Sequence, residues 1–308
     1  MNQTPPVLDF TGERFTPECV REIWYEHWHR YAFARSLAEG RRVLDAACGE
    51  GYGSAMLAGA ARAVLGLDIS ADAIAHAQAR YAGAGNLTFR VADATRLDLP
   101  AASIDLVVSF ETLEHVDAQD ALLDGFARTL TDDGLLLISS PDKATYSDAT
   151  GFRNEFHVRE LYRDELLALL GRHFPHVRLY GQKLLFQSTI WDLQRGPCGR
   201  VQPVTATADG GPVECLDYAP LYFIALCSRQ PLPEAVPVLS LFGDRDESVY
   251  RHYNHEIRKN IAAGGRIAEL EAALARAGAE RDALRAQATA AAHSEPRAVA
   301  WWQRLWRR

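Results

Sequence analysis

The sequence contains few cysteines, and they form no recognisable pattern. The five Cys residues among 308 are an odd number, and no two of them stand in a C-x-x-C pair. This spacing excludes the common zinc-binding motifs and indicates no disulfide framework. Thiols that stay reduced are typical of a cytoplasmic protein, so we expect a cytoplasmic location.

Long hydrophobic runs and an excess of basic residues are also absent. The longest apolar run, 221–227, is far too short to cross a bilayer, and the N-terminus lacks the basic start and apolar stretch of a secretory signal. Forty acidic against 33 basic residues give a formal net charge of −7. This balance argues against nucleic acid as a partner, because such proteins need a basic surface to neutralise phosphates.

The sequence does contain a regular alternation of strand-like and helix-like segments from residue 41 onward. Apolar strands are predicted at 41–47, 63–68, 87–93, 104–110, 134–141, 176–182 and 221–228. Helices are predicted at 71–82, 117–130 and 159–171. Such an alternation is typical of a parallel sheet covered by helices, so we expect an α/β, Rossmann-like fold with a seven-stranded, mostly parallel sheet.

Composition divides the chain into five segments. They are an N-terminal lead-in with an aromatic helix (1–40), the α/β domain (41–228, with an insertion or lid at about 183–219), a Pro-rich linker (229–254), a helix (255–292) and a basic, Trp-rich tail (293–308). Apolar residues in the helix approximate a heptad seam, which indicates a coiled coil. We expect this C-terminal extension to contact a second copy of the chain or a partner protein.

The strongest local signal is the stretch VLDAACGEGYGS at 43–54. A strand ends at Asp45 and passes into a turn with Gly49 and Gly51, after which a helix begins. Glycines let the backbone turn sharply and approach a ligand closely. The carboxylates of Asp45 and Glu50 would repel a pyrophosphate at this helix N-terminus, but they would attract a ligand that carries ammonium and sulfonium groups. The charge therefore favours S-adenosylmethionine over a dinucleotide.

Four segments in order resemble the motifs of class I S-adenosylmethionine-dependent methyltransferases. The glycine loop resembles their first motif, Asp68 matches the acidic residue that holds the ribose hydroxyls, and Asp93 with Ala94 matches the adenine contact. SFETLEHV at 109–116 looks like the fourth-strand motif of ubiquinone-type and sugar methyltransferases. The resemblance implies S-adenosylmethionine as cofactor, bound by Asp45, Ala46, Cys48, Gly49, Gly51, Asp68, Ile69, Asp93, Ala94 and Phe110.

The acidic and histidine residues after the fourth strand are candidates for the chemistry. Glu111, Glu114 and His115 lie where open parallel sheets bind their ligands. An oxygen acceptor benefits from a general base, and His115 is the first candidate, with Glu111 beside it. Packing beneath the cofactor is the alternative for His115. Related ubiquinone O-methyltransferases are thought to bind a divalent ion with this motif, so a metal site of these three residues is a further alternative, which we do not favour.

The stretch NEFHVRELYRDELLALL at 154–170 resembles a segment of bacterial sugar and polysaccharide-cluster methyltransferases. The resemblance implies that His157 acts as a base or a sugar contact, whereas a capping or packing histidine is the alternative. Tyr25 and Trp28 are candidates to stack on a sugar or on adenine, although core packing is the commoner role of such residues.

These resemblances favour O-methylation of a sugar hydroxyl on a glycan or nucleotide-sugar. N- or C-methylation and a phenol or quinone-type acceptor are alternatives, and a non-catalytic scaffold that works through the coiled coil is another. Residues 296–308 combine four Arg with three Trp and no acidic residue. This composition is typical of a peripheral membrane anchor, with a disordered tail or a docking peptide as the alternative.

Overall fold

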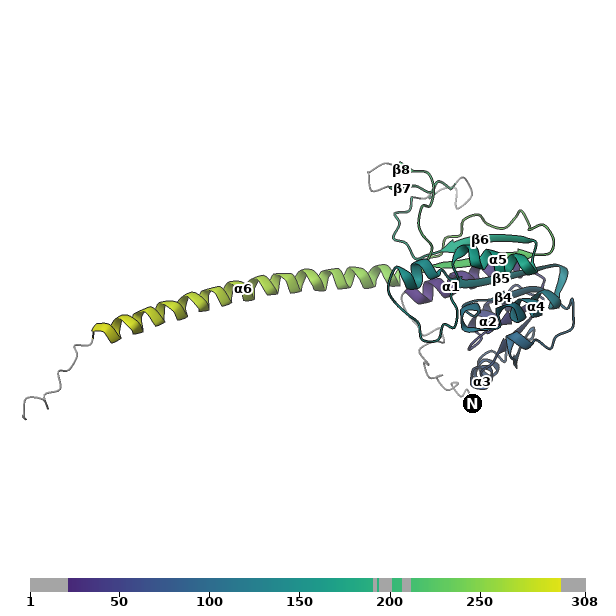
Figure 1. Ribbon diagram of the computed structural model, residues 1–308, viewed down its shortest axis with the longest axis horizontal. Helices are drawn as coiled ribbons and strands as arrows, with labels where there is room; N and C mark the ends of the chain where they lie inside the picture. Colours follow the sequence, from purple (N-terminus) through teal and green to yellow (C-terminus); the bar gives the residue numbers. More distant parts are fainter. Residues whose placement is uncertain (1–21, 191–192, 194–200, 207–211, 295–308) are drawn as a thin grey trace, which may run out of the picture. The chain divides into compact units, whose positions relative to one another are not determined.

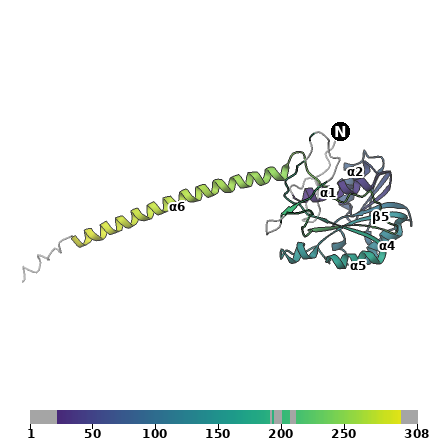
Figure 2. The same ribbon diagram turned by 90° about the horizontal axis from the view of Figure 1, so that it is seen from above.

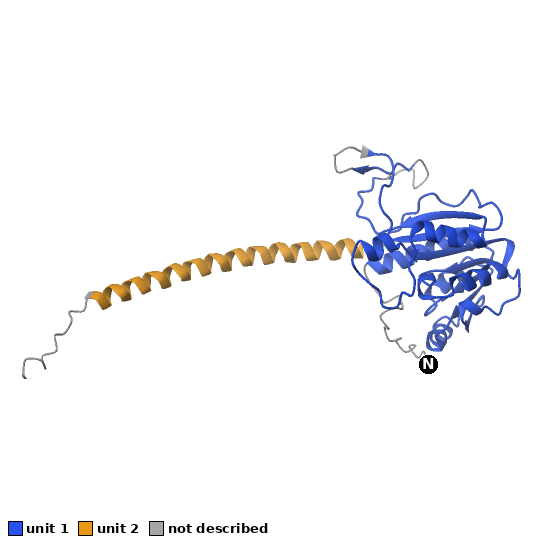
Figure 3. Ribbon diagram, viewed as in Figure 1, with its two compact units in different colours: residues 1–243 blue, residues 244–308 orange. Residues whose placement is uncertain are grey.

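The chain forms two compact units, residues 1–243 and 244–308, in the computed structural model (Figure 3). The structure describes residues 22–294 apart from 191–192, 194–200 and 207–211. The start of the predicted lead-in and the anchor at 296–308 therefore lie outside the described residues. Within the described part of the chain, no helix combines the length and the apolar character needed to cross a membrane.

Unit 1 is built on a seven-stranded sheet with the order β3-β2-β1-β4-β5-β9-β6. The strands are β1 (Arg42–Ala46), β2 (Ala63–Asp68), β3 (Leu87–Val91), β4 (Ile104–Ser109), β5 (Leu130–Pro141), β6 (His176–Gln182) and β9 (Tyr222–Ser228). Strands β1 to β5 pair in parallel, and β9 runs antiparallel to both of its neighbours. The predicted seven-stranded, mostly parallel sheet is confirmed.

Helices cover both faces of the sheet and make three layers (Figures 1 and 2). One face packs against α1 (Glu22–Leu37), α2 (Tyr52–Ala58) and α3 (Ala71–Arg80), and the other against α4 (Gln119–Thr129) and α5 (Arg163–His173). Alternate strand residues face opposite layers, so that Val43 packs with the first group and Leu44 with the second. The sheet is therefore buried on both sides, which explains its nearly continuous apolar strands.

The connections after the strands carry the polar groups of the site. Short helical turns, η1 (Ala94–Arg96), η2 (Leu113–His115) and η3 (Ala144–Asp148), follow β3, β4 and β5. The predicted insertion at 183–219 contains a two-stranded hairpin of β7 (Thr205–Ala206) and β8 (Pro212–Val213).

Two predicted boundaries near the C-terminus differ from the structure. Leu232 and Val236, in the predicted linker, pack against the core of unit 1. In unit 2, α6 (Ser248–Ser294) begins earlier than the predicted residue 255. The Asp244 carboxylate accepts a hydrogen bond from the Ser248 backbone N–H at 3.1 Å, which satisfies a donor that the first turn of the helix leaves open.

Candidate functional site

The turn after β1 depends on glycine. Gly49 and Gly51 have φ of 56° and 88°, in the left-handed region that favours glycine. A Cβ atom on Gly51 would lie 2.6 Å from the ring of Phe89, and one on Gly53 would lie 2.0 Å from the ring of Tyr31. Helix α2 can therefore begin this close to β3 and α1 only because these residues have no side chain.

Asp45 lies at the end of β1, with no exposed surface. Its carboxylate accepts hydrogen bonds from the Ser54 hydroxyl at 2.6 Å and from the Tyr31 hydroxyl at 3.1 Å. Burial raises the pKa of Asp45 to about 7, although both hydroxyl donors oppose the rise. Asp45 thus joins α1 and α2 at the glycine loop. Neither hydroxyl was predicted, and nothing local in the sequence marks Tyr31 as a partner of the loop.

Asp68 connects the end of β2 to the same loop. One carboxylate oxygen accepts a hydrogen bond from the Gly49 backbone N–H at 2.9 Å, and the other accepts one from Ser70 at 2.8 Å. The predicted cofactor residues Ala46, Cys48, Gly49 and Asp68 thus lie together at the carboxyl ends of β1 and β2. Ile69, beside them, is 74% exposed, which leaves its side chain open to a ligand.

Asp93 and Phe110 complete the predicted cofactor residues. The Asp93 carboxylate accepts hydrogen bonds from the Thr95 hydroxyl at 2.7 Å and backbone N–H at 2.9 Å, and these bonds lower its pKa. Asp93 thereby caps the turn that begins at Ala94. Phe110 packs edge-on against the ring of Tyr31 at 5.1 Å and belongs to the core. Their contacts with a cofactor stay predictions.

Glu50 was predicted to attract the positively charged cofactor, but its carboxylate faces the protein. Its side chain is 1% exposed, and its carboxylate lies 3.2 Å from His76 Nε2 and 3.3 Å from the Arg80 guanidinium. The Tyr81 hydroxyl donates a third contact at 3.2 Å. The carboxylate is therefore bound to α3 and to the residue that follows it, and it is not an uncompensated charge facing a ligand. Asp45, the other carboxylate that was predicted to attract the cofactor, is likewise buried and bonded to neighbouring side chains.

Glu111 follows β4 and is held by its neighbours. Its φ is 48°, and its carboxylate accepts a hydrogen bond from the Ser139 hydroxyl at 2.6 Å. The Arg30 guanidinium, 1% exposed, lies 3.4 Å from the same carboxylate oxygen. Arg30 also donates to Gln182 at 2.7 Å and lies over the ring of Tyr222 at 4.4 Å. These contacts occupy the carboxylate, so Glu111 is better suited to hold α1 over the sheet edge than to accept a substrate proton.

Glu114, His115 and His157 lie together beyond β4. One ligand atom from each residue falls within 4.8 Å of the others. Both Glu114 carboxylate oxygens are buried without a hydrogen-bond partner in the described part of the chain, and burial raises the pKa of this carboxyl group. Glu111, a member of the predicted metal alternative with Glu114 and His115, is bound to Arg30 and lies outside this group, which contains His157 instead.

Hydrogen bonds orient both histidines of this group. The His115 Nδ1 lies 3.0 Å from the Phe156 carbonyl, which can only accept, so Nδ1 carries the proton. The His157 Nδ1 lies 2.5 Å from the Glu160 carboxylate, and the Asn154 amide nitrogen lies 3.0 Å from His157 Nε2. In the neutral ring, His157 thus presents the lone pair of Nε2. The Glu160 partner was not predicted, although the spacing H-x-x-E is a local signal for it.

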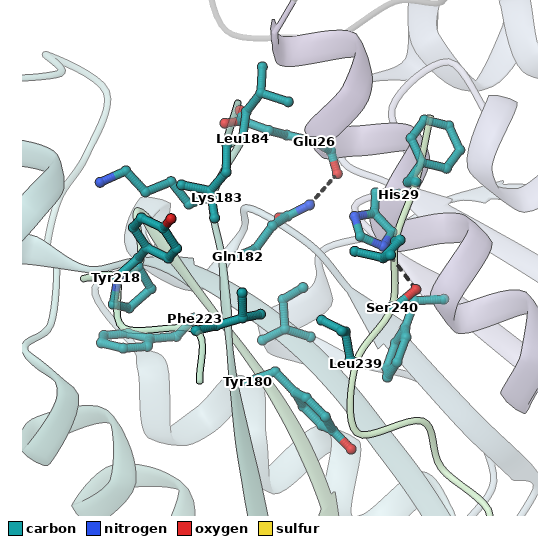
Figure 4. Close-up of a pocket in the computed structure, with 18 of the residues that line it drawn as sticks. Glu26, His29, Tyr180, Gln182, Lys183, Leu184, Tyr218, Phe223, Leu239 and Ser240 are labelled. Atoms are coloured by element: carbon teal, nitrogen blue, oxygen red, sulfur yellow. Dashed lines mark hydrogen bonds between the residues drawn. The ribbon is translucent and has the colours of Figure 1, made fainter. Parts of the chain in front are cut away.

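Of the two candidate aromatic substrate contacts, only Tyr25 lines a cavity. Trp28 stacks on Trp24 at 5.1 Å and packs near Tyr52 at 6.0 Å, as part of the core. The cavity, of about 600 Å³, lies among α1, the end of β6, the insertion and residues 238–242. Figure 4 shows Gln182 bonded to Glu26 and His29 bonded to Ser240 along its wall.

This cavity is separate from the glycine loop, none of whose residues lines it. Gln182 lies in the cavity wall and accepts a hydrogen bond from Arg30, and Arg30 in turn forms the ion pair with Glu111 at the sheet edge. Burial raises the pKa of Glu26 to about 7, so this wall includes a carboxyl group that exchanges a proton near neutrality. Aromatic rings and polar groups on several elements are typical of a binding cavity.

Comparison with known proteins gives consistent results. The Methyltransferase domain family matches residues 44–138. The chain is 38% identical over 170 residues to a "Probable S-adenosylmethionine-dependent methyltransferase" of Mycobacterium tuberculosis. The aligned region covers 54% of this chain and 61% of that protein. It is 30% identical to Phosphoethanolamine N-methyltransferase 1 of Arabidopsis thaliana (48% of this chain, 28% of that protein) and 30% identical to the Ubiquinone biosynthesis O-methyltransferase of Sinorhizobium medicae (39% and 49%).

The chain spans about three fifths of the length of the mycobacterial relative that it matches. The matched family region includes the glycine loop, Asp68, Asp93 and the segment 109–116. These residues gather at the carboxyl ends of β1 to β4 in the fold described above. Residues 44–138 therefore belong to the Methyltransferase domain family, and the chain has the fold and the cofactor motifs of class I S-adenosylmethionine-dependent methyltransferases.

Proposed function

We propose that the protein transfers a methyl group from S-adenosylmethionine to a hydroxyl group of a sugar, on a glycan or nucleotide-sugar. The observation that carries this proposal is the buried pair of His157 and Glu160 beyond the carboxyl ends of the strands. A hydroxyl is a poor nucleophile while it keeps its proton, and this pair supplies a group that can accept it.

The chain's own residues have three tasks in this reaction. S-adenosylmethionine, when bound, supplies the methyl group and a good sulfur leaving group. The glycine loop and Asp68 hold the cofactor so that the acceptor oxygen can approach in line, and such positioning supplies about 7–11 kcal/mol. His157 accepts the hydroxyl proton at Nε2, after the acceptor displaces the Asn154 amide from that nitrogen. Glu160 holds Nδ1–H and stabilises the imidazolium that forms.

The sugar acceptor rests on two supports. The segment at 154–170 resembles sugar methyltransferases, and it carries the His157–Glu160 pair. The cavity beside α1, whose lining includes neither His157 nor the glycine loop, presents Tyr25 and Tyr218 together with Glu26 and Lys183, a mixture of aromatic faces and polar groups that suits sugar rings away from the reacting hydroxyl. Because relatives at 30% identity include an N-methyltransferase and a ubiquinone O-methyltransferase, amine and phenol acceptors are the competing classes.

A divalent cation is an alternative to the general base. Glu114, His115 and His157 fit one, because the Nδ1 of each histidine is held by an acceptor, as is typical of metal-binding imidazoles, and the Glu114 carboxylate lacks a hydrogen-bond partner in the described part of the chain. Such an ion would supply Lewis acidity to the acceptor hydroxyl. Dialysis against EDTA separates the two mechanisms, since turnover by the base alone survives it.

The proposal is tested with labelled S-adenosylmethionine and three acceptor panels, namely nucleotide-sugars with oligosaccharides, phosphorylated amines, and phenols. We expect label in the sugar panel and a fall in turnover of about 100-fold or more in His157→Gln, with calorimetric affinity for S-adenosylmethionine unchanged. His173→Gln is the matched control, because this histidine bonds to Asp120 and Asp124 away from the site. Label in the amine or phenol panel alone would refute the sugar acceptor.

A further inference from the structure

Helix α6 carries an unused apolar stripe. Its 47 residues run from Ser248 to Ser294, and Ile267, Leu270, Leu274 and Leu284 are 52–76% exposed. Burying one such side chain fully stabilises a protein by about 1.5–3 kcal/mol, so this stripe favours association. A helix can form without apolar residues on one side, so the propensity of α6 to be helical does not explain the stripe.

The stripe has the spacing of a coiled-coil seam. From residue 267 onward, apolar positions alternate in steps of three and four, as they do in a heptad repeat. The a positions are Ile267, Leu274, Arg281 and Ala288, and the d positions are Leu270, Ala277, Leu284 and Ala291. With this assignment, the flanking g positions include Arg266 and Glu280, and the flanking e positions include Glu271 and Arg285.

We propose that residues 267–291 pair with the same segment of a second copy of this chain, as a parallel, in-register, two-stranded coiled coil. In that arrangement each g residue faces the e residue five positions later on the partner helix. Arg266 then faces Glu271, and Glu280 faces Arg285, so both charged positions of each helix meet the opposite charge. The dimer has four such pairs by symmetry.

Other alignments lose this complementarity. A shift of two heptads brings Arg266 opposite Arg285 in one direction and Glu280 opposite Glu271 in the other, and both contacts are repulsive. In an antiparallel pair that overlaps the whole seam, g faces g, so that Arg266 meets Gln287 and Glu280 meets Ala273. Because e residues likewise face e residues there, neither the Arg266–Glu271 nor the Glu280–Arg285 contact forms, so these g–e pairs favour the parallel register.

Arg281 is the one charged residue at an a position of the seam. Its stem can pack across the seam while its guanidinium stays on Asp282 of its own helix, which it contacts at 2.8 Å. A single polar a residue lowers the stability of a coiled coil but restricts its register and oligomeric state. We therefore expect a dimer that dissociates at low concentration.

Analytical ultracentrifugation of the full chain tests the interface. We expect twice the 34.1 kDa chain mass at micromolar loading and above, and a rise in the dissociation constant of at least about 100-fold in the double variant Leu270→Glu and Leu284→Glu. The double variant Ala272→Glu and Ala279→Glu, on the opposite side of α6, keeps the dimer. A monomer at all concentrations, a trimer, or a dimer that survives the seam variant would overturn the proposal.

Charge reversal tests the orientation. Glu280→Arg turns two attractive pairs into repulsive ones, so the dissociation constant rises about tenfold, and Arg285→Glu has the same effect. Combining the two substitutions restores the wild-type value in the parallel register, because the pairs are attractive again. An antiparallel pair gives no such rescue, since residues 280 and 285 do not meet there.

Discussion

The polar groups at the carboxyl edge of the sheet differ between two halves, the first beyond β1 and β2 and the second beyond β4. Beyond β1 and β2, the carboxylates of Asp45 and Asp68 are bonded to hydroxyls and backbone N–H groups of the protein itself. Beyond β4, the Glu114 carboxylate has no hydrogen-bond partner among the described residues, and the His157 Nε2 contacts only the amide side chain of Asn154 among the hydrogen bonds described above. The first half is organised before any ligand arrives, whereas the second half keeps its acceptors for a ligand.

This difference follows from the two tasks of a methyltransferase. A cofactor common to the family is bound by a loop whose geometry the backbone itself defines, so its acidic residues serve first to hold that loop. An acceptor must give up a proton, and a group that takes it cannot be saturated by the protein. The substitutions below test whether each half works in this way.

The largest effect is expected where α1 meets the second half. Arg30→Met removes the cation from the buried surroundings of Glu111 and Glu26, and a carboxylate left without its partner costs about 3–5 kcal/mol of unfolding free energy. Denaturant unfolding measures this loss. Arg35→Met, at an exposed position of the same helix, is expected to change stability by less than about 0.5 kcal/mol. Equal stability of the two variants would show that the ion pair does not hold α1.

The first half is tested through the pH dependence of stability. Burial raises the pKa of Asp45 from 3.8 to about 7, so the folded protein holds a proton that the unfolded chain has lost between these values. The Asp45 contribution to stability is therefore complete below about pH 4 and is lost as the pH rises to 7. Asp45→Asn avoids this loss, and its stability relative to wild type should rise by about 2–3 kcal/mol between pH 5 and pH 8.

Denaturant titrations of both proteins at the two pH values give this difference directly. Asp98→Asn, at an exposed site, serves as the control, and its difference from wild type should not depend on pH. A pH-independent difference for Asp45→Asn would mean that the carboxyl group is ionised in the fold at both values.

The elements of the first half were predictable because their signals are local. The strands are continuous apolar runs, and Asp45, Gly49 and Gly51 stand within seven residues of one another. The Tyr31 partner of Asp45 was not predictable, because Tyr31 reaches it only after α1 has packed against the sheet, and Arg30 reaches Glu111 of the second half in the same way. Burial has the same non-local origin, and Glu50 shows this, since its position indicates a charged loop residue but the fold binds it to α3.

Returning to the second half, Glu160→Gln tests whether the carboxylate acts through His157. The amide still fits beside Nδ1 but cannot stabilise the imidazolium, so turnover should fall about 10–100-fold with the KM for S-adenosylmethionine unchanged. Steady-state kinetics with the acceptor that takes up label in the panel experiment measure both constants. Glu155→Gln, at an exposed neighbouring position, should leave both constants unchanged. A fall in stability without a change in kcat would assign Glu160 a purely structural role.

The smallest effect is expected for Asp68→Asn in the first half. Asparagine has the same shape but one acceptor oxygen instead of two, so either Gly49 or Ser70 loses its hydrogen bond, and any contact with the ribose hydroxyls weakens. We expect calorimetric affinity for S-adenosylmethionine to fall about tenfold, with kcat at saturation unchanged, because the residue binds ground state and transition state alike. Asp72→Asn, exposed in the first turn of α3, is the matched control. Unchanged affinity in Asp68→Asn would mean that this carboxylate only supports the loop, and the cofactor half would then be organised without binding through its acids.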